Sequence, residues 1–132
     1  YDTDLAELGV NEDVMLLAYS PLAAGLLTGK YAPDAPPPPG SRRAVNANLG
    51  GRVTPRVWDA IAAYHTIAGE AGLDPVQMAL AWVLQRPFPA LPIIGATTTQ
   101  QLEHLLGATE LVLSADVLAA IDRAHKAHPM PF

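Results

Sequence analysis

Two short apolar segments constrain the fold of this chain more than any other feature. Residues Val14 to Tyr19 and Leu91 to Ile94 are apolar without alternation, and each lies between turn-forming residues. Continuous apolar runs of this length are typical of strands that are covered on both faces, as in parallel sheets. Two such strands cannot shield each other, because an isolated pair is marginal at best. We therefore expect the sheet to continue into further chain or into a partner.

Helical patterns surround these strands, and the resulting order of elements predicts an α/β fold with a parallel sheet. Each expected helix has an apolar stripe and a start or stop signal. They cover residues 2–8 before Gly9, residues 54–71 with Thr54 as N-cap and Gly72 as stop, a segment from the N-cap Asp74 to Pro87, a segment from Thr98, and a last one from Ser114. The expected inner faces are Val57, Ile61, Tyr64 and Ala68; Val76, Ala79, Leu80, Val83 and Leu84; Leu102, Leu105 and Leu106; and Val117, Leu118, Ile121 and Ala124.

A long connection, residues 31–53, separates the first strand from the helices that follow. It holds the run Pro36 to Pro39, the basic pair Arg42 and Arg43, and several glycines. Loops of this length are uncommon in a compact domain unless they form lids or are disordered. The proline run is expected to be a stiff polyproline spacer within a lid-like loop. Residues 1–132 are otherwise expected to form one segment of a single domain.

Composition excludes several classes of protein. The net charge of −5 leaves no basic surface for nucleic acid or an anionic membrane, and no apolar run approaches the length of a membrane span. The absence of cysteine excludes disulfides and thiolate chemistry. His125 and His128 have a spacing found in metal sites but no third ligand nearby, so no metal is expected. A cytoplasmic location is the expectation.

Two segments share one layout, in which an apolar strand leads through small residues into a helix start. They are residues 17–30 and residues 93–102. Small residues at the carboxyl end of a strand let a ligand approach the backbone, and a helix N-terminus offers free N–H groups to a phosphate. A well-formed strand–helix loop without a ligand explains the same layout.

The motifs in these segments resemble the aldo-keto reductase superfamily over nearly the whole chain. They are the string from Ala18 to Leu22 with Gly25 and residues 27–31, the string from Asp74 to Leu84, the string from Ile93 to Thr98 with Gln101 and Leu102, and Leu113-Ser114. The middle strings are most similar to the bacterial Tas-type branch, which is near the potassium-channel β-subunits.

The resemblance implies a (β/α)8 TIM barrel that reduces aldehydes and ketones with NADPH by hydride transfer. Such barrels take roughly 250 residues, so this chain would correspond to the C-terminal part, with the last two strands and their helices. The family's catalytic Asp, Tyr, Lys and His match no residue here. The chain alone is therefore predicted to be inactive.

The resemblance also implies residues that bind the nicotinamide cofactor. The position of Tyr19 holds an aromatic ring that stacks on the nicotinamide, and the next residues follow the pyrophosphate. Basic residues then neutralise phosphates, and the second segment surrounds the adenosine 2′-phosphate and ribose. NADP is favoured over NAD on the strength of the two basic residues. The full set is Tyr19, Ser20, Pro21, Leu22, Ala23, Lys30, Arg42, Gly95, Thr97 and Gln101.

One departure from the family concerns adenine. The family commonly has Glu-Asn where this chain has His104-Leu105, and a leucine has no hydrogen-bonding group for the base.

The prediction is the cofactor-binding part of an NADPH-dependent reductase of small carbonyl substrates. Its other partner would be the remainder of the barrel or another copy of the chain. Two alternatives stay open: a non-catalytic interaction module that docks through unpaired strand edges, and a redox-sensing protein similar to a channel β-subunit.

Overall fold

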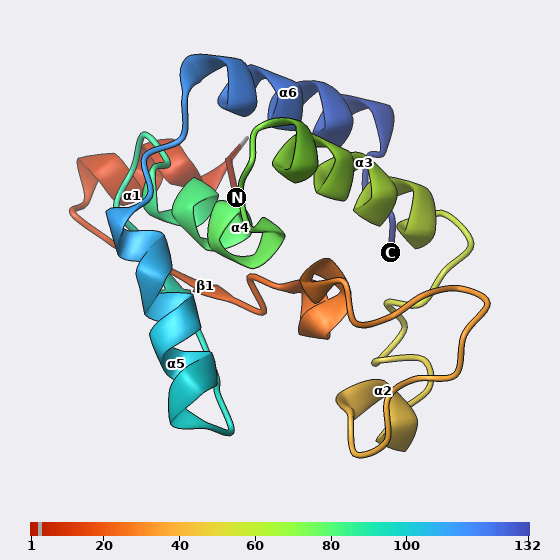
Figure 1. Ribbon diagram of the computed structural model, residues 1–132. Coiled ribbons are helices and arrows are strands. Elements are labelled where there is room, and N and C mark those ends of the chain that lie inside the picture. Colours follow the sequence, from red (N-terminus) through yellow and green to blue (C-terminus); the bar gives the residue numbers. More distant parts are fainter. Residues whose placement is uncertain (3) are drawn as a thin grey trace.

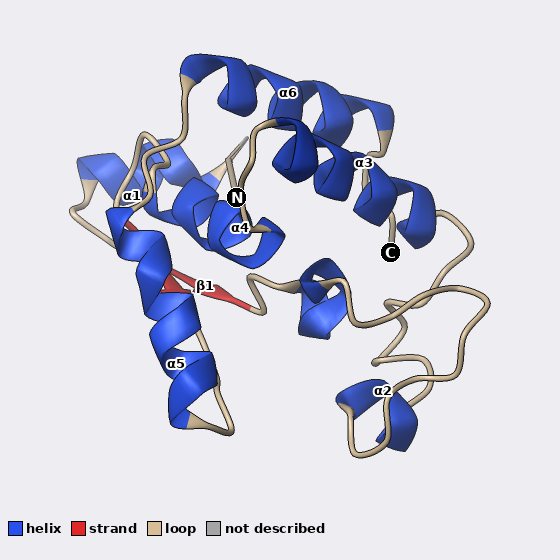
Figure 2. Cartoon of the chain, viewed as in Figure 1, coloured by secondary structure: helices blue, strands red, loops and turns tan. Residues whose placement is uncertain are grey.

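The structure is a computed structural model, and it describes residues 1–2 and 4–132. The predicted helices and strands follow one another in the expected order (Figure 1), and the structure adds the short helices η1, α2 and η2. Figure 2 shows that helices and loops make up most of the chain and that the strands are short. The bounds are α1 Leu5–Asn11, β1 Leu16–Tyr19, η1 Ala23–Thr28, α2 Arg42–Val45, α3 Val57–Glu70, α4 Pro75–Leu84, β2 Ala90–Ile93, α5 Thr99–Leu106, η2 Gly107–Glu110 and α6 Ala115–Ala127.

Strands β1 and β2 are parallel neighbours, and in the described residues they form a sheet of two strands. Tyr19 lies opposite Ile93, so the carboxyl ends of both strands meet at one edge. Strand β1 is shorter than its apolar run, since Val14 and Met15 lie outside the ladder. Strand β2 has the predicted length but begins one residue earlier, at Ala90, and leaves Ile94 outside.

The two faces of this sheet differ. Helix α4 packs on β2 on the covered face, whereas Leu17, Tyr19, Leu91 and Ile93 alternate onto the other face with between 47% and 75% of their surface exposed. The expectation of strands covered on both faces is wrong for the described chain. The expectation that two strands cannot cover each other is confirmed, because half of the apolar strand residues lack a covering layer.

Helix α1 differs most from its prediction. It runs through Gly9 to Asn11 instead of ending before that glycine, and Gly9 is its buried residue. A Cβ on Gly9 would lie 2.6 Å from the Tyr1 hydroxyl and 2.9 Å from the Val14 carbonyl oxygen. The glycine therefore permits close packing inside the helix instead of terminating it.

Helix α3 begins at Val57, two residues later than its sequence signal indicates, and no side chain caps it. The Thr54 hydroxyl donates instead to the carbonyl of Pro131, near the other end of the chain. A tertiary contact has therefore replaced the predicted local cap.

The caps of α4, α5 and α6 are as predicted. Asp74 accepts from the Gln77 N–H at 2.9 Å, Thr98 from Gln101, and Ser114 from Val117. Side-chain caps of this kind satisfy N–H groups that have no partner inside the helix.

The helices bury three apolar clusters. One lies between η1, the long loop and α3; one between α3, α4 and α6; and one between α4, α5 and η2. Of the predicted inner face of α5, Leu105 is buried while Leu102 and Leu106 are exposed, because α4 and η2 cover one side of that helix only.

The long loop is packed against the protein. Tyr31 and Leu49 are buried with Leu26, Val57 and Ile61, and the short helix α2 lies within the loop. The expected Pro-rich lid-like segment is thus held by its own apolar anchors at both ends.

Among the described residues no single helix is long and apolar enough to cross a membrane. The helical segments Thr99–Glu110 and Ala115–Ala127 reach the required length and hydropathy only when taken together, and they are bent by 112° relative to each other.

Candidate functional site

The turn after β1 has a strained backbone. Ser20, Ala23 and Ala24 have φ angles of 54°, 49° and 57°, in the left-handed region that L-residues rarely adopt, and Gly25 follows at 94°. Each such residue other than glycine costs about 1–2 kcal/mol. Strain of this kind clusters at ligand sites, where surrounding structure maintains it. The turn that the sequence predicts to bind the cofactor therefore contains strained backbone at three non-glycine residues.

The residues that follow this turn anchor it in the core. Leu26 is fully buried in the cluster beneath the long loop, and the Thr28 hydroxyl donates to the Gly25 carbonyl at 2.7 Å. A rigid base of this kind can hold Ser20 to Ala23 at the edge of the sheet, with Tyr19 exposed just before them.

Lys30 lies between two residues of this region. Its Nζ is 5.1 Å from the centre of the Tyr31 ring. A Cβ on Gly25 would come within 3.1 Å of the Lys30 side chain. The glycine therefore leaves the space that the lysine occupies.

The structure distinguishes the two arginines of the loop. The Arg43 guanidinium donates to the Ala32 carbonyl at 2.8 Å and lies over the rings of Tyr31 and Trp58. Arg42 is exposed, and its side chain has no recorded hydrogen bond or ion pair in the described part of the chain. Of the two loop arginines, Arg42 is therefore the one whose side chain is exposed and unengaged among the described residues, and it is the one in the predicted cofactor-binding set.

The second segment is held by local hydrogen bonds. Gln101 Oε1 accepts from both the backbone N–H and the hydroxyl of Thr97, at 2.9 Å each. Thr97 and Gln101 are thus brought together as predicted, but the Thr97 proton is directed at Gln101. A phosphate would have to replace that contact.

Gly95 has no role in the packing of the chain. A Cβ there would meet no atom within 4 Å, and Gly95 is not among the glycines with positive φ. The space beside the Gly95 backbone is therefore open among the described residues.

Both segments lie at the carboxyl edge of the sheet. Strand β1 points toward η1, and in the view of Figure 1 the start of α5 lies on one side of η1 and α2 on the other. Ligands of parallel α/β proteins bind at this edge, and in TIM barrels the active site lies at the same end.

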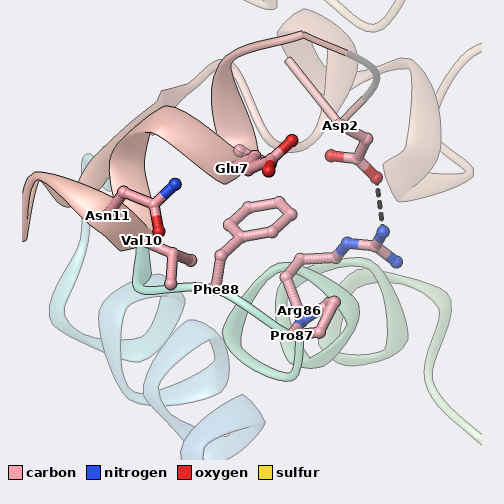
Figure 3. A pocket seen from close by; sticks show the side chains of 8 residues that line it. Asp2, Glu7, Val10, Asn11, Arg86, Pro87 and Phe88 are labelled. Carbon is pink, nitrogen blue, oxygen red and sulfur yellow. Dashed lines mark hydrogen bonds and ion pairs between the residues drawn. The ribbon is translucent and has the colours of Figure 1, made fainter.

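The hollow in Figure 3 lies at the opposite edge. It has a volume of about 350 Å³ between α1 and residues 86–88, which precede β2. An Asp2–Arg86 ion pair and the Phe88 ring line it. Its place at the amino ends of the strands separates it from the predicted site.

A second hollow of about 520 Å³ lies between the end of α3 and the start of α6, also away from the predicted residues. No group of three or more His, Asp or Glu side chains that could hold a metal occurs among residues 1–2 and 4–132.

Sequence reasoning missed Tyr31. Burial raises the pKa of this tyrosine, but hydrogen bonds from the Arg43 backbone and from Ser41, together with the charge of Lys30, outweigh burial and leave the pKa below its ordinary value. The available signal was a tyrosine directly after Lys30, followed by a loop that returns with Ser41 and Arg43.

Comparison with known proteins agrees with this geometry. The sequence model described as the Aldo/keto reductase family matches residues 2–126. The chain belongs to the aldo/keto reductase family, which confirms the resemblance drawn from its motifs. It has the fold of a C-terminal part of a (β/α)8 TIM barrel, with two strands and their helices.

Individual relatives extend the comparison. The chain is 43% identical to protein Tas of Escherichia coli over 99% of its own length and 38% of that protein. It is 35% identical to a putative voltage-gated potassium channel subunit β of Schizosaccharomyces pombe, over 79% of the chain and 32% of that protein. A glycerol dehydrogenase from Gluconobacter oxydans superposes with a TM-score of 0.75 at 23% identity, covering 99% of this chain and 39% of that structure. The chain therefore spans less than two fifths of these relatives.

Proposed function

We propose that this chain is the cofactor-binding part of an NADPH-dependent aldo-keto reductase. The observation that carries the proposal is the strained turn after β1, with an exposed aromatic ring before it and the cations Lys30 and Arg42 after it. This arrangement combines a stacking surface, an accessible backbone and positive charge, which a phosphorylated dinucleotide requires.

Each residue has a role in the proposal. Tyr19 would stack on the nicotinamide ring, and the backbone of Ser20 to Ala23 would follow the pyrophosphate. Lys30 and Arg42 would neutralise phosphate charge, which favours NADP over NAD. At the second strand Gly95 would admit the ribose, with Thr97 and Gln101 as hydrogen-bonding partners of the 2′-phosphate.

The bound cofactor would supply the hydride that reduces an aldehyde or ketone. The chain's own residues would hold the cofactor, and the small carbonyl substrate would be partly walled by residues 31–53 and the C-terminal tail. The tail is tied to the residues that directly follow that loop, because the Arg56 guanidinium donates to the Met130 carbonyl at 3.1 Å and Thr54 donates to Pro131.

A titration of NADPH and NADH into the protein as its gene encodes it tests the proposal. Arg42→Gln should weaken NADPH binding about tenfold, since a charge-assisted hydrogen bond contributes about 1.5–3 kcal/mol, with a much smaller effect on NADH. Arg123→Gln on α6 is the control and should change neither. Equal NADPH affinity of the wild type and Arg42→Gln would contradict the proposal.

Residues 1–132 in isolation should show no carbonyl reduction, because no position matches the family's proton donor. NADPH oxidation with an added aldehyde, at a rate abolished by Tyr19→Ala, would overturn this prediction. A cytoplasmic location also stays a prediction.

One observation favours the second candidate, an interaction module. The exposed face of Leu17, Tyr19, Leu91 and Ile93 is continuous across both strands, and such a face calls for a covering partner. Light scattering separates the candidates: a monomer with one sharp unfolding transition excludes the module. An oligomer that dissociates in Leu17→Ser but not in Leu5→Ser, an exposed leucine on α1, supports it.

A further inference from the structure

The Tyr31 hydroxyl is the meeting point of two parts of the candidate site. The side chain is buried, with 5% of its surface exposed. Its oxygen accepts a hydrogen bond from the Arg43 backbone N–H at 3.2 Å. The Ser41 and Lys30 side chains lie close enough to the phenol to lower its pKa, and Lys30 Nζ is 5.1 Å from the centre of the ring. Apolar packing of the ring alone does not require polar neighbours around the hydroxyl.

These contacts join the end of the first turn to helix α2. Lys30 belongs to the turn, where it lies between Gly25 and the Tyr31 ring. Ser41 is the N-cap of α2 and accepts from the Ala44 N–H. Arg42 directly precedes Arg43, whose backbone N–H donates to the phenol oxygen, so Tyr31 fixes the backbone next to that arginine.

The ring and the hydroxyl have separable functions. The ring packs with Leu26 and Leu49 in the cluster beneath the loop, and it lies under the Lys30 and Arg43 cations. Phenylalanine would keep all of this. Removal of the hydroxyl alone would release the Arg43 N–H, and with it the placement of Arg42 relative to Lys30.

We propose that the Tyr31 hydroxyl is a positioning group that holds Lys30 and Arg42 in one arrangement for the 2′-phosphate of the dinucleotide. The inference rests on the proposed cofactor function and adds to it the residue that sets the preference for the phosphorylated cofactor. Two long cationic side chains on separate segments lose less entropy on binding when their backbones are already fixed.

The test uses Tyr31→Phe in the protein as its gene encodes it, with 2′,5′-ADP and 5′-ADP as ligands that differ only in the 2′-phosphate. Tyr31→Phe should weaken 2′,5′-ADP binding at least fivefold and leave 5′-ADP binding within twofold. Tyr64→Phe is the matched control, because it removes a half-buried hydroxyl from α3, and it should change neither affinity.

If Tyr31 has a purely structural role, Tyr31→Phe should lower the affinities for 2′,5′-ADP and 5′-ADP together. If the hydroxyl has no role, both affinities should stay unchanged. Either result overturns the inference. When Arg42→Gln is already present, adding Tyr31→Phe should weaken 2′,5′-ADP binding less than twofold, since the guanidinium that Tyr31 positions is then absent. An undiminished effect there also overturns it.

A second measurement assigns the Tyr31 phenol by the titration signal that Tyr31→Phe removes. A 2′-phosphate close to Lys30 adds negative charge beside Tyr31, so this phenol should ionise at higher pH with 2′,5′-ADP than with 5′-ADP. Identical titrations with the two ligands overturn the inference.

The failure of each proposal is distinguishable. If Arg42→Gln weakens NADPH binding while Tyr31→Phe leaves 2′,5′-ADP binding intact, the cofactor proposal stands and the positioning role of Tyr31 falls. If the wild-type protein binds neither NADPH nor 2′,5′-ADP, both fall.

Discussion

The two strand–helix junctions of this chain carry the same sequence layout but are stabilised differently. The first, after β1, combines left-handed backbone at Ser20, Ala23, Ala24 and Gly25 with the fully buried Leu26 and with cations held against Tyr31. The second, after β2, is exposed and depends on hydrogen bonds between residues close in sequence, Thr97, Thr98 and Gln101. The first junction is thus part of the core, and the second is a local cap on the surface.

The difference shows why one motif can have two physical origins. In the first junction the glycine is required by the chain itself, because Gly25 has a φ of 94° and touches Lys30. In the second, Gly95 is required neither by backbone angle nor by packing. A small residue at a strand end can therefore serve the fold or leave room for a ligand, and only the structure distinguishes these uses.

The largest expected difference between the junctions lies in their leucines. Leu26→Ala should lower the free energy of unfolding by about 3 kcal/mol, as for other fully buried leucines. Leu102→Ala, at a residue that is 41% exposed, should lower it by less than about 1 kcal/mol. Urea denaturation measures both, and comparable losses would contradict the assignment of the first junction to the core.

The two glycines should respond in different ways. Gly25→Ala should cost about 2 kcal/mol, because alanine at this φ is strained. Gly95→Ala should stay within about 0.5 kcal/mol of wild type and should weaken NADPH binding. Unfolding and NADPH titration of the same two proteins check this pair. A stable Gly25→Ala, or a Gly95→Ala with unchanged affinity, would remove the distinction.

The cap of α5 should contribute less than the buried leucine of the first junction. Thr98→Ala removes the oxygen that accepts from the Gln101 N–H at 3.1 Å and should cost about 1 kcal/mol. Thr99→Ala removes a neighbouring hydroxyl that is not the cap and should cost less. Thermal unfolding compares the two variants, and a reversed order would show that the second junction is held in another way.

The smallest expected effect is the dependence of stability on alkaline pH. The pKa of Tyr31 is lowered, since its hydrogen bonds and Lys30 outweigh burial, so folding should gain stability as the pH rises through the lowered value toward 10. Burial raises the pKa of Tyr64, so stability that is fully present below pH 10 should be lost as the pH rises through the raised value. Unfolding of Tyr31→Phe and Tyr64→Phe between pH 8 and 11 should therefore diverge from wild type in opposite directions.

Much of the fold could be predicted from short-range signals. The caps Asp74, Thr98 and Ser114 each act on an N–H three residues along the chain, so the sequence alone contains both partners. The predicted helix end at Gly9 and the predicted cap at Thr54 were wrong because the partners of these residues lie outside the local pattern. Tyr1 and Val14 lie close to the glycine, and the Pro131 carbonyl accepts from the threonine.

The same division applies to the candidate site. The sequence indicated the turn after β1 and the pair of basic residues in the loop. It favoured Arg42 over Arg43 only through the family resemblance, and it did not reveal that Arg43 is bound to Ala32 and that its backbone N–H donates to Tyr31. Those distinctions depend on how residues 31–53 fold back, which no local pattern encodes.

By itself the sequence determined the family, the order of helices and strands, and the conclusion that two apolar strands need more cover than they give each other. The tertiary structure decided which face of those strands is left open, which glycine has a purely internal role, and which cation is available to a ligand. The physical reason is range: hydrophobic periodicity and helix caps act over a few residues, whereas burial and charge placement depend on segments that meet only after the chain has folded.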